Sequence, residues 1–276
     1  MQLGIFAKTF DGKTPGSVMA AAKAAGFATV QYNMACSGLD SMPDMITAGT
    51  ADDIAIAAKA HGVAVCAISG TYNMIHPDKA VRTQGLQRLQ VLVAKARPMG
   101  TRLITLCTGT RDPHDQWRHH PDNDSREAWR DLVTEVRAAL AIADRYEVDL
   151  GIEPELANVV NSAEKAAFLI KDMGSKRLRV VLDAANLFEH EGVVEQRRIV
   201  SSAIDMLGPH IAMAHAKDRS ADGHFVAAGT GVLDYDHYLS ELAAAGFNGP
   251  LVTHGLSADE APEVAGFLRS ALNVIA

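Results

Sequence analysis

Three side chains of metal-binding type stand at or next to the ends of apolar runs. Glu153 ends VDLGIE (148–153), Asp183 ends LRVVLD (178–183), and His215 lies next to the end of HIAMAHA (210–216). Two carboxylates and one imidazole suit Mn²⁺, Mg²⁺, Co²⁺ or Zn²⁺. A shared cation would also offset the repulsion between neighbouring carboxylates. We therefore expect these side chains to bind one divalent metal ion, although each alone could be a cap or a core residue.

A second glutamate, Glu155, follows Glu153 with Pro154 between them. Residues two apart on a strand share a side, so Glu155 faces the same rim if the strand continues. A carboxylate beside the metal, but not bound to it, could act as a base or accept a hydrogen bond from a substrate hydroxyl. A glutamate in an exposed loop is the alternative interpretation.

These residues need a scaffold that brings strand ends to one rim. Eight apolar runs of strand type alternate with eight segments of helical periodicity, the runs being 3–7, 28–33, 63–69, 102–108, 148–153, 178–183, 210–216 and 250–255. Such runs are typical of parallel strands covered on both faces. The count predicts an α/β fold, a single (β/α)8 TIM barrel forming one domain, residues 1–276. A doubly wound open sheet is the alternative, but the chain lacks G-x-G-x-x-G after the first run.

Two connections after predicted strands are long, 109–125 and 217 to about 233. In a barrel both lie at the carboxyl end, where active sites are built. Trp117 in the first favours a lid or a pocket wall. In the second, Lys217, Arg219 and the G-T-G at 229–231 are candidates for a phosphate site, although a short G-x-G is also typical of a plain turn. Asn73 and His76, after the third run, could face the pocket or form the turn before a helix.

The overall composition excludes several classes of protein. The formal net charge is −7, with 33 acidic residues against 26 basic ones, whereas nucleic-acid binding needs a basic face. No apolar run is long enough to cross a membrane, and the first residues lack the pattern of a signal peptide. We expect a cytoplasmic protein that acts on a small molecule, with no nucleic-acid or membrane partner. Assembly into a homo-oligomer stays open.

The chain resembles the xylose isomerase-like TIM barrel family, in particular its sugar phosphate isomerase and epimerase group. The resemblance covers essentially the whole chain and lies in GIEPE, LDAANL, HAKD and the tail that ends in GPLVTHGL. It implies a metal held by Glu, Asp, His and Glu at the ends of the fifth to eighth strands. It also implies isomerisation or epimerisation of ketoses through an enediolate. Matching positions are the ligands Glu153, Asp183 and His215, and the substrate-side residues Asn186, Lys217 and Asp218.

One position departs from the family pattern. His254 stands where the eighth strand normally ends in the glutamate that binds metal and transfers a proton. The resemblance then implies a fourth ligand or substrate contact at His254, with proton transfer falling mainly to a carboxylate, Glu153 or Glu155. One-base isomerisation or elimination is favoured over symmetric two-base epimerisation.

The expected function is a divalent-metal-dependent isomerase or epimerase of a sugar or related keto-polyol. A metal-dependent lyase or dehydratase of a keto-sugar or keto-acid is an alternative on the same barrel. A non-catalytic sugar-binding barrel is a second alternative. A DNA-repair endonuclease shares the architecture, but it needs a basic groove that this acidic chain does not favour.

Overall fold

The computed structural model describes residues 1–275. Within this range eight parallel strands close into a barrel in which β10 pairs with β1. In order around the barrel they are β1 (Gln2–Phe6), β2 (Thr29–Tyr32), β3 (Ala64–Ser69), β4 (Leu103–Cys107), β5 (Asp149–Glu153), β6 (Leu178–Asp183), β7 (Ile211–Ala216) and β10 (Pro250–Thr253). The predicted (β/α)8 barrel is confirmed. Because the sheet closes, the doubly wound alternative is wrong.

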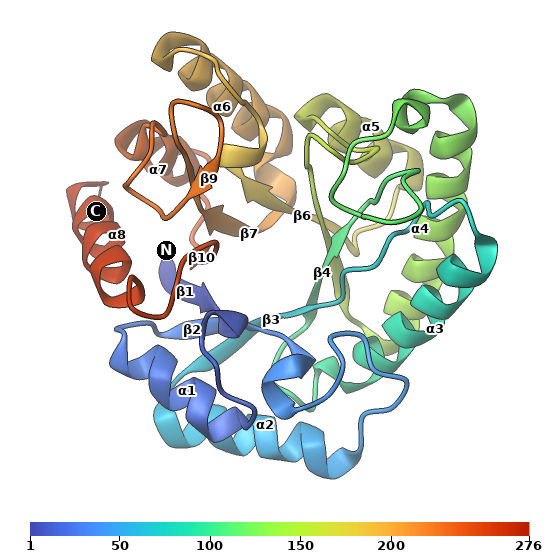
Figure 1. Ribbon diagram of the computed structural model, residues 1–276, viewed down its shortest axis with the longest axis horizontal. Coiled ribbons are helices and arrows are strands. Elements are labelled where there is room, and N and C mark those ends of the chain that lie inside the picture. Colours follow the sequence, from blue (N-terminus) through green and yellow to red (C-terminus); the bar gives the residue numbers. More distant parts are fainter. Residues whose placement is uncertain (276) are drawn as a thin grey trace.

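Eight α-helices of the described range form a ring outside the strands (Figure 1). They are α1 (Pro15–Ala24), α2 (Ala48–His61), α3 (Lys79–Ala96), α4 (Arg126–Tyr146), α5 (Ala163–Met173), α6 (Val193–Leu207), α7 (Tyr235–Ala244) and α8 (Ala261–Ile275). The N-terminus and α8 lie on the same side of the barrel (Figure 1). Within residues 1–275, no helix combines the length and apolar character needed to cross a bilayer.

The helix boundaries follow from side chains that satisfy the free backbone groups at helix ends. Six helices begin after a residue whose side-chain oxygen accepts a hydrogen bond from an N–H of the first turn. These residues are Thr14, Thr47, Asp78, Ser125, Ser162 and Asp234. Two helices end at a glycine in the left-handed conformation, Gly62 and Gly174.

Two layers of side chains alternate along the strands and prepare the carboxyl end of the barrel. The lower layer is apolar and consists of Ala67, Leu103, Val181, Met213 and Val252. Residues two positions further along a strand face the same side. The layer above is therefore formed by Ser69, Thr105, Asp183, His215 and His254. The polar residues stand on an apolar floor, and the strand period sets their height.

Glu153 belongs to the same upper layer, two residues after Gly151. A Cβ atom at position 151 would lie 2.9 Å from Val181 Cγ2. The missing side chain of Gly151 therefore leaves room for the apolar floor directly below the carboxylate.

The long connection after β4 is fixed to the neighbouring β5 loop. Asn123, in the short 3-10 helix η3 (Pro121–Asp124), accepts hydrogen bonds from Thr110 Oγ1 at 3.1 Å and Arg111 N at 2.7 Å. Its Nδ2 donates to Ala157 O at 2.9 Å. Asn158 Oδ1 accepts from Gly109 N at 2.7 Å. The segment that carries Trp117 is thus anchored at its base by two buried amides.

The connection after β7 contains a small antiparallel pair, β8 (Asp218–Arg219) and β9 (Phe225–Val226). This pair follows directly on the strand that carries His215. Long connections in barrels are places where functional loops are built, and both long loops here carry ordered structure of their own.

Candidate metal centre and sugar cavity

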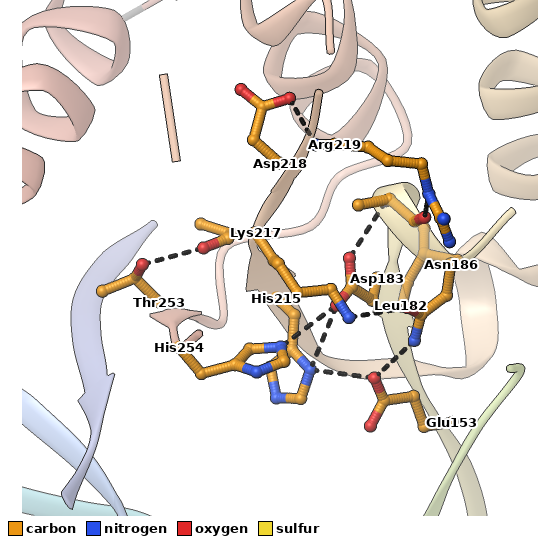
Figure 2. Close-up of polar contacts among 12 residues, drawn as sticks. Glu153, Leu182, Asp183, Asn186, His215, Lys217, Asp218, Arg219, Thr253 and His254 are labelled. Carbon is orange, nitrogen blue, oxygen red and sulfur yellow. Dashed lines mark hydrogen bonds and ion pairs between the residues drawn. The ribbon is translucent and has the colours of Figure 1, made fainter. Parts of the chain in front are cut away.

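Four side chains converge at the carboxyl end of the barrel (Figure 2). Glu153, Asp183, His215 and His254 each offer one ligand atom, and these atoms all lie within 4.8 Å of one another. Asp183 Oδ2 lies 3.1 Å from His254 Nε2 and 3.9 Å from His215 Nδ1. Glu153 Oε1 lies 3.2 Å from His215 Nδ1. Two carboxylate oxygens and two imidazole nitrogens in one small volume are a donor set that fits a divalent first-row metal ion.

Neighbouring strand ends are tied together at this point. Asp183 of β6 and His215 of β7 are register partners. The Tyr238 hydroxyl, on α7, lies 3.1 Å from both Leu182 O and His215 O and donates between them. Thr253 Oγ1 donates to Ala216 O at 2.8 Å and joins β10 to β7. The backbone positions of three ligands are therefore fixed by hydrogen bonds from the barrel itself.

The four ligands differ in their exposure. The side chains of Asp183 and His215 are 0% and 4% exposed, whereas those of Glu153 and His254 are 20% and 23% exposed. The ion would therefore rest on a buried Asp183 and His215. Glu153 and His254 face the space above them.

The electrostatic environment favours the carboxylate forms of Asp183 and Glu153 and the neutral form of His254. Burial alone would raise the pKa of Asp183, but the Lys217 ammonium and His254 outweigh it and hold that pKa well below its usual range. Burial lowers the pKa of His254 and the neighbouring His215 lowers it further, while the hydrogen bond with Asp183 acts in the opposite direction. For Glu153, burial opposes ionisation, while His215 holds its pKa below the usual value. Carboxylate and neutral imidazole are the metal-binding forms of these groups.

Lys217 and Asn186 connect the ligands to each other. Lys217 Nζ lies 3.2 Å from Asp183 Oδ2 and donates to Asn186 Oδ1 at 2.7 Å. Asn186 Nδ2 donates to Glu153 Oε1 at 2.8 Å. The structure thus places both residues directly beside the ligand group, where Lys217 offsets part of its negative charge.

Gln31 on β2 is a member of the site that the sequence analysis did not identify. Its Oε1 lies 2.9 Å from His215 Nε2, and its Nε2 donates to Thr105 Oγ1 at 3.0 Å. Metal-binding histidines usually donate the N–H of their second ring nitrogen to such an acceptor. With Nδ1 of His215 on an ion, Nε2 would carry the proton and donate a hydrogen bond to Gln31 Oε1. Gln31 is therefore placed to fix the orientation of His215.

A cavity of about 300 Å³ opens above the ligands. Glu153, His215 and His254 form part of its wall, and Trp117 of the β4 loop borders it. The other lining residues are Phe6, Lys8, Gln31, Asn33, Ser41, Ser69, Thr71, Thr105 and Gln116. Hydroxyl and amide groups on this scale suit a small polyhydroxylated molecule. Ser69 and Thr105 were not predicted from the sequence. The strand period could have identified them, since each lies two residues after a residue of the apolar floor.

Glu155 lies beside this group but is not among the residues that line the cavity. Burial raises the pKa of its carboxyl to about 7, Lys217 acts in the opposite direction, and the charges of Glu153 and Asp183 raise it further. Its carboxyl is therefore close enough to the ligands to interact with them electrostatically.

Asn73 and His76 lie outside the cavity. Asn73 Oδ1 accepts from Thr110 N at 3.1 Å and its Nδ2 donates to Thr110 O at 2.8 Å. His76 Nδ1 accepts from Asp78 N at 3.0 Å, as expected of a turn before a helix. Both line a neighbouring hollow of about 460 Å³, which shares Thr71 and Gln116 with the cavity. In the structure these two residues support loops.

Asp218 is bound by the backbone of its own loop. Its Oδ1 accepts from Arg219 N and Leu233 N at 2.8 and 2.9 Å. Its Oδ2 accepts from Gly229 N and Gly231 N at 3.1 and 3.0 Å. Burial raises the pKa of this carboxyl, while the four N–H groups act against the shift. Asp218 therefore organises the G-T-G turn and is directed away from the metal-binding group (Figure 2).

The fold and the site together define a TIM barrel whose carboxyl end carries a possible metal-binding group beside a small cavity with a largely polar lining. The chain belongs to the xylose isomerase-like TIM barrel family, whose family model matches residues 19–271. The resemblance in the sequence motifs is thereby confirmed.

Curated relatives are sugar epimerases by name. L-ribulose-5-phosphate 3-epimerase UlaE of Escherichia coli O157:H7 (strain EC4115 / EHEC) is 28% identical over 193 residues, which are 68% of this chain and 63% of the relative. The protein of the same name from Shigella flexneri serotype 5b is 26% identical over 181 residues, or 65% of this chain and 58% of the relative. The chain therefore spans less than two thirds of the length of these relatives.

Solved structures of similar shape cover nearly the whole chain. An L-ribulose 3-epimerase has a TM-score of 0.79 at 20% identity, covering 99% of this chain and 95% of its own. The 3-keto-D-glucoside 4-epimerase YcjR from E. coli has a TM-score of 0.76 at 16% identity, covering 98% and 99%. The IOLI protein with a bound zinc atom has a TM-score of 0.74 at 17% identity, covering 100% and 98%. At these identities the likeness shows the fold.

Proposed function

We propose that this chain is a divalent-metal-dependent isomerase or epimerase of a keto-sugar or related keto-polyol, acting through an enediolate. One observation carries the proposal. Glu153, Asp183, His215 and His254 gather at the base of a cavity whose remaining polar lining consists largely of hydroxyls and amides. The sugar epimerases among the relatives and the zinc atom in the IOLI structure support it.

The residues divide the chemistry among them. A divalent ion held by the four ligands would polarise the sugar carbonyl and make the adjacent C–H more acidic. Glu153, which faces the cavity, is placed to take that proton. Ser69, Asn33 and Thr105 offer hydrogen bonds to sugar hydroxyls, and the Trp117 ring forms part of the cavity wall.

The number of candidate bases favours proton transfer by a single base. Among the cavity-lining residues of the described range, Glu153 is the one carboxylate. His254 Nε2 lies 3.1 Å from Asp183 Oδ2, so this nitrogen is positioned as a ligand and cannot also accept a substrate proton. Glu155, whose carboxyl interacts electrostatically with Glu153 and Asp183, is the further carboxylate that we propose for catalysis. We therefore favour one-base isomerisation, and the same arrangement supports a lyase or dehydratase as the second candidate.

Hydrogen exchange tests this function without knowledge of the product. The protein is loaded with Mn²⁺, Co²⁺, Zn²⁺ or Mg²⁺ and incubated in D₂O with a panel of ketoses, and deuterium at the carbon next to the carbonyl is followed by NMR. We expect exchange on at least one ketose, its loss after chelation, and a decrease of about 10²–10⁴-fold in Glu153→Gln. Glu155→Gln, on the neighbouring loop, should slow exchange while metal content is unchanged. Absence of both exchange and conversion to an isomer or epimer, with every metal and every ketose, would refute the proposal.

A further inference from the structure

The cavity presents few positive charges to a ligand. Among its lining residues within 1–275, Lys8 is the one lysine and there is no arginine. The Lys8 side chain is exposed to water. Proteins bind phosphate groups with arginine forks, helix N-termini or concave groups of backbone N–H donors. A single exposed lysine is a weak substitute, because water and salt screen its charge.

The loop turn best suited to bind a phosphate is already filled by the protein itself. The two carboxylate oxygens of Asp218 accept from four backbone N–H groups, at 2.8–3.1 Å, in the turn that contains Gly229 and Gly231. Such a group of converging N–H donors is what a phosphate oxygen would need. A Cβ atom at position 231 would lie 2.4 Å from Asp218 Oδ1. The glycine is therefore explained by the close approach of Asp218, without a ligand.

The two cations of the same loop are also engaged. Lys217 contacts Asp183 and Asn186, as described above, and Figure 2 shows it directed toward them. Arg219 Nε donates to Ala185 O at 3.0 Å, and a second guanidinium nitrogen donates to Gly223 O. The Phe225 ring centroid lies 3.6 Å from Lys217 Nζ and 4.1 Å from Arg219 Cζ. A phosphate group would have to break these contacts before it could bind either cation.

We infer that the cavity selects an uncharged keto-sugar and disfavours the phosphate ester of the same sugar. This inference rests on the proposed function, because it assumes a keto-sugar ligand. With an ion in place, its two positive charges are offset by Glu153 and Asp183. The remaining cation beside these ligands, Lys217, contacts Asp183 and is not among the residues that line the cavity, so it is not presented to a phosphate dianion. The substrate would then differ from the phosphorylated sugar in the name of the curated relatives.

Matched pairs of ligands test the selection directly. Dissociation constants are measured by calorimetry on the Mn²⁺-loaded protein for L-ribulose against L-ribulose 5-phosphate and for D-fructose against D-fructose 6-phosphate. Exchange in D₂O is recorded on the same samples. We expect at least one free ketose to bind about tenfold or more tightly than its ester, a difference of about 1.4 kcal/mol.

Two different failures are distinguishable. If an ester binds as tightly as its free sugar, or more tightly, while exchange occurs, the selection is wrong and the proposed function stands. If neither member of any pair binds, and neither exchange nor conversion occurs with any metal or ketose of the panel, both are overturned.

The variant Lys8→Ala separates a real phosphate contact from a diffuse charge. We expect it to change the ratio of the two dissociation constants by less than about fivefold, the range of an exposed charge pair. Lys13→Ala, at an exposed lysine outside the cavity lining, is the matched control. The inference is overturned if the wild type binds the ester more tightly than the free sugar and this preference is lost in Lys8→Ala but kept in Lys13→Ala. Lys8 would then be a phosphate site.

Discussion

The two halves of the barrel rim carry different chemistry at the same height. Strands β5, β6, β7 and β10 lead to carboxylates and imidazoles, namely Glu153, Asp183, His215 and His254. Strands β2, β3 and β4 carry neutral amides and hydroxyls at the cavity wall, namely Gln31, Ser69 and Thr105. We interpret the first half as the metal-binding side and the second as the side that recognises sugar hydroxyls.

The two halves of the rim also differ in the side-chain contacts that connect their residues. On the metal side, Lys217 and Asn186 link the ligands through charged hydrogen bonds. On the other side a single amide, Gln31, crosses from Thr105 to His215 and joins the halves. Substitutions on the metal side should therefore affect ion binding strongly, those at Gln31 moderately, and those in the neutral half mainly affect sugar binding.

The largest effect is expected at Asp183. Asp183→Asn keeps the shape of the side chain but removes the anion that His254 and Lys217 contact. Since loss of an outer partner already costs about 10–100-fold in metal affinity, loss of this ligand should cost more. Elemental analysis and titration with Mn²⁺ measure it, with Ser69→Ala as the control in the neutral half. Unchanged metal content in Asp183→Asn would contradict the ligand assignment.

His254 decides how far this site departs from the family. His254→Ala should weaken metal binding and turnover together. His254→Glu should keep the ion, since a carboxylate also binds divalent metals, and should add epimerisation of ketoses, as the family resemblance implies. Chromatography of the products formed by the Mn²⁺-loaded variants shows whether His254→Ala has lost turnover and whether His254→Glu forms an epimer. If His254→Ala leaves both metal affinity and turnover unchanged, His254 has a structural role and the one-base mechanism loses its support.

Gln31 tests the connection between the halves. Gln31→Leu keeps the volume but removes the acceptor for His215 Nε2, so we expect metal affinity to fall by about 10–100-fold. Gln31→Glu retains an acceptor and should restore most of the affinity. Gln116→Leu is a matched control, because Gln116 lines the same cavity and, within the described residues, its side chain makes no hydrogen bond to the four candidate ligands. Equal metal affinity in Gln31→Leu and Gln116→Leu would remove Gln31 from the site.

The smallest effects are expected in the neutral half. Ser69→Ala removes one hydroxyl from the cavity wall, and a lost hydrogen bond of this kind costs about 0.5–1.5 kcal/mol. We expect KM for the ketose to rise by up to about tenfold. Steady-state kinetics at saturating metal measures this. A metal affinity that falls with the KM change would show that the two halves do not act separately.

The strand ends could be predicted from sequence because the signal is local. A polar residue stands at or next to the end of each of these apolar runs, and the carboxyl ends of parallel strands in a barrel lie at one rim. His254 came from the family resemblance, because a histidine after PLVT has no distinctive local pattern.

The remaining site residues depend on contacts between distant segments. In the sequence, Gln31 is a polar residue within an apolar run. Its hydrogen-bond partners Thr105 and His215 are 74 and 184 positions away. Asn73 and Asp218 have residue types common in binding sites, but the first bonds to Thr110 and the second to the G-T-G turn. These hydrogen bonds to backbone groups can be identified only after the loops have been placed in the folded structure.

The central claim is that one divalent ion binds among Glu153, Asp183, His215 and His254. The most direct measurement is anomalous diffraction at the manganese absorption edge from crystals grown with Mn²⁺. We predict one strong peak within bonding distance of the two carboxylates, His215 Nδ1 and His254 Nε2. A protein that exchanges ketose hydrogens in Mn²⁺ while its crystals show manganese elsewhere, or none at this site, would contradict the claim.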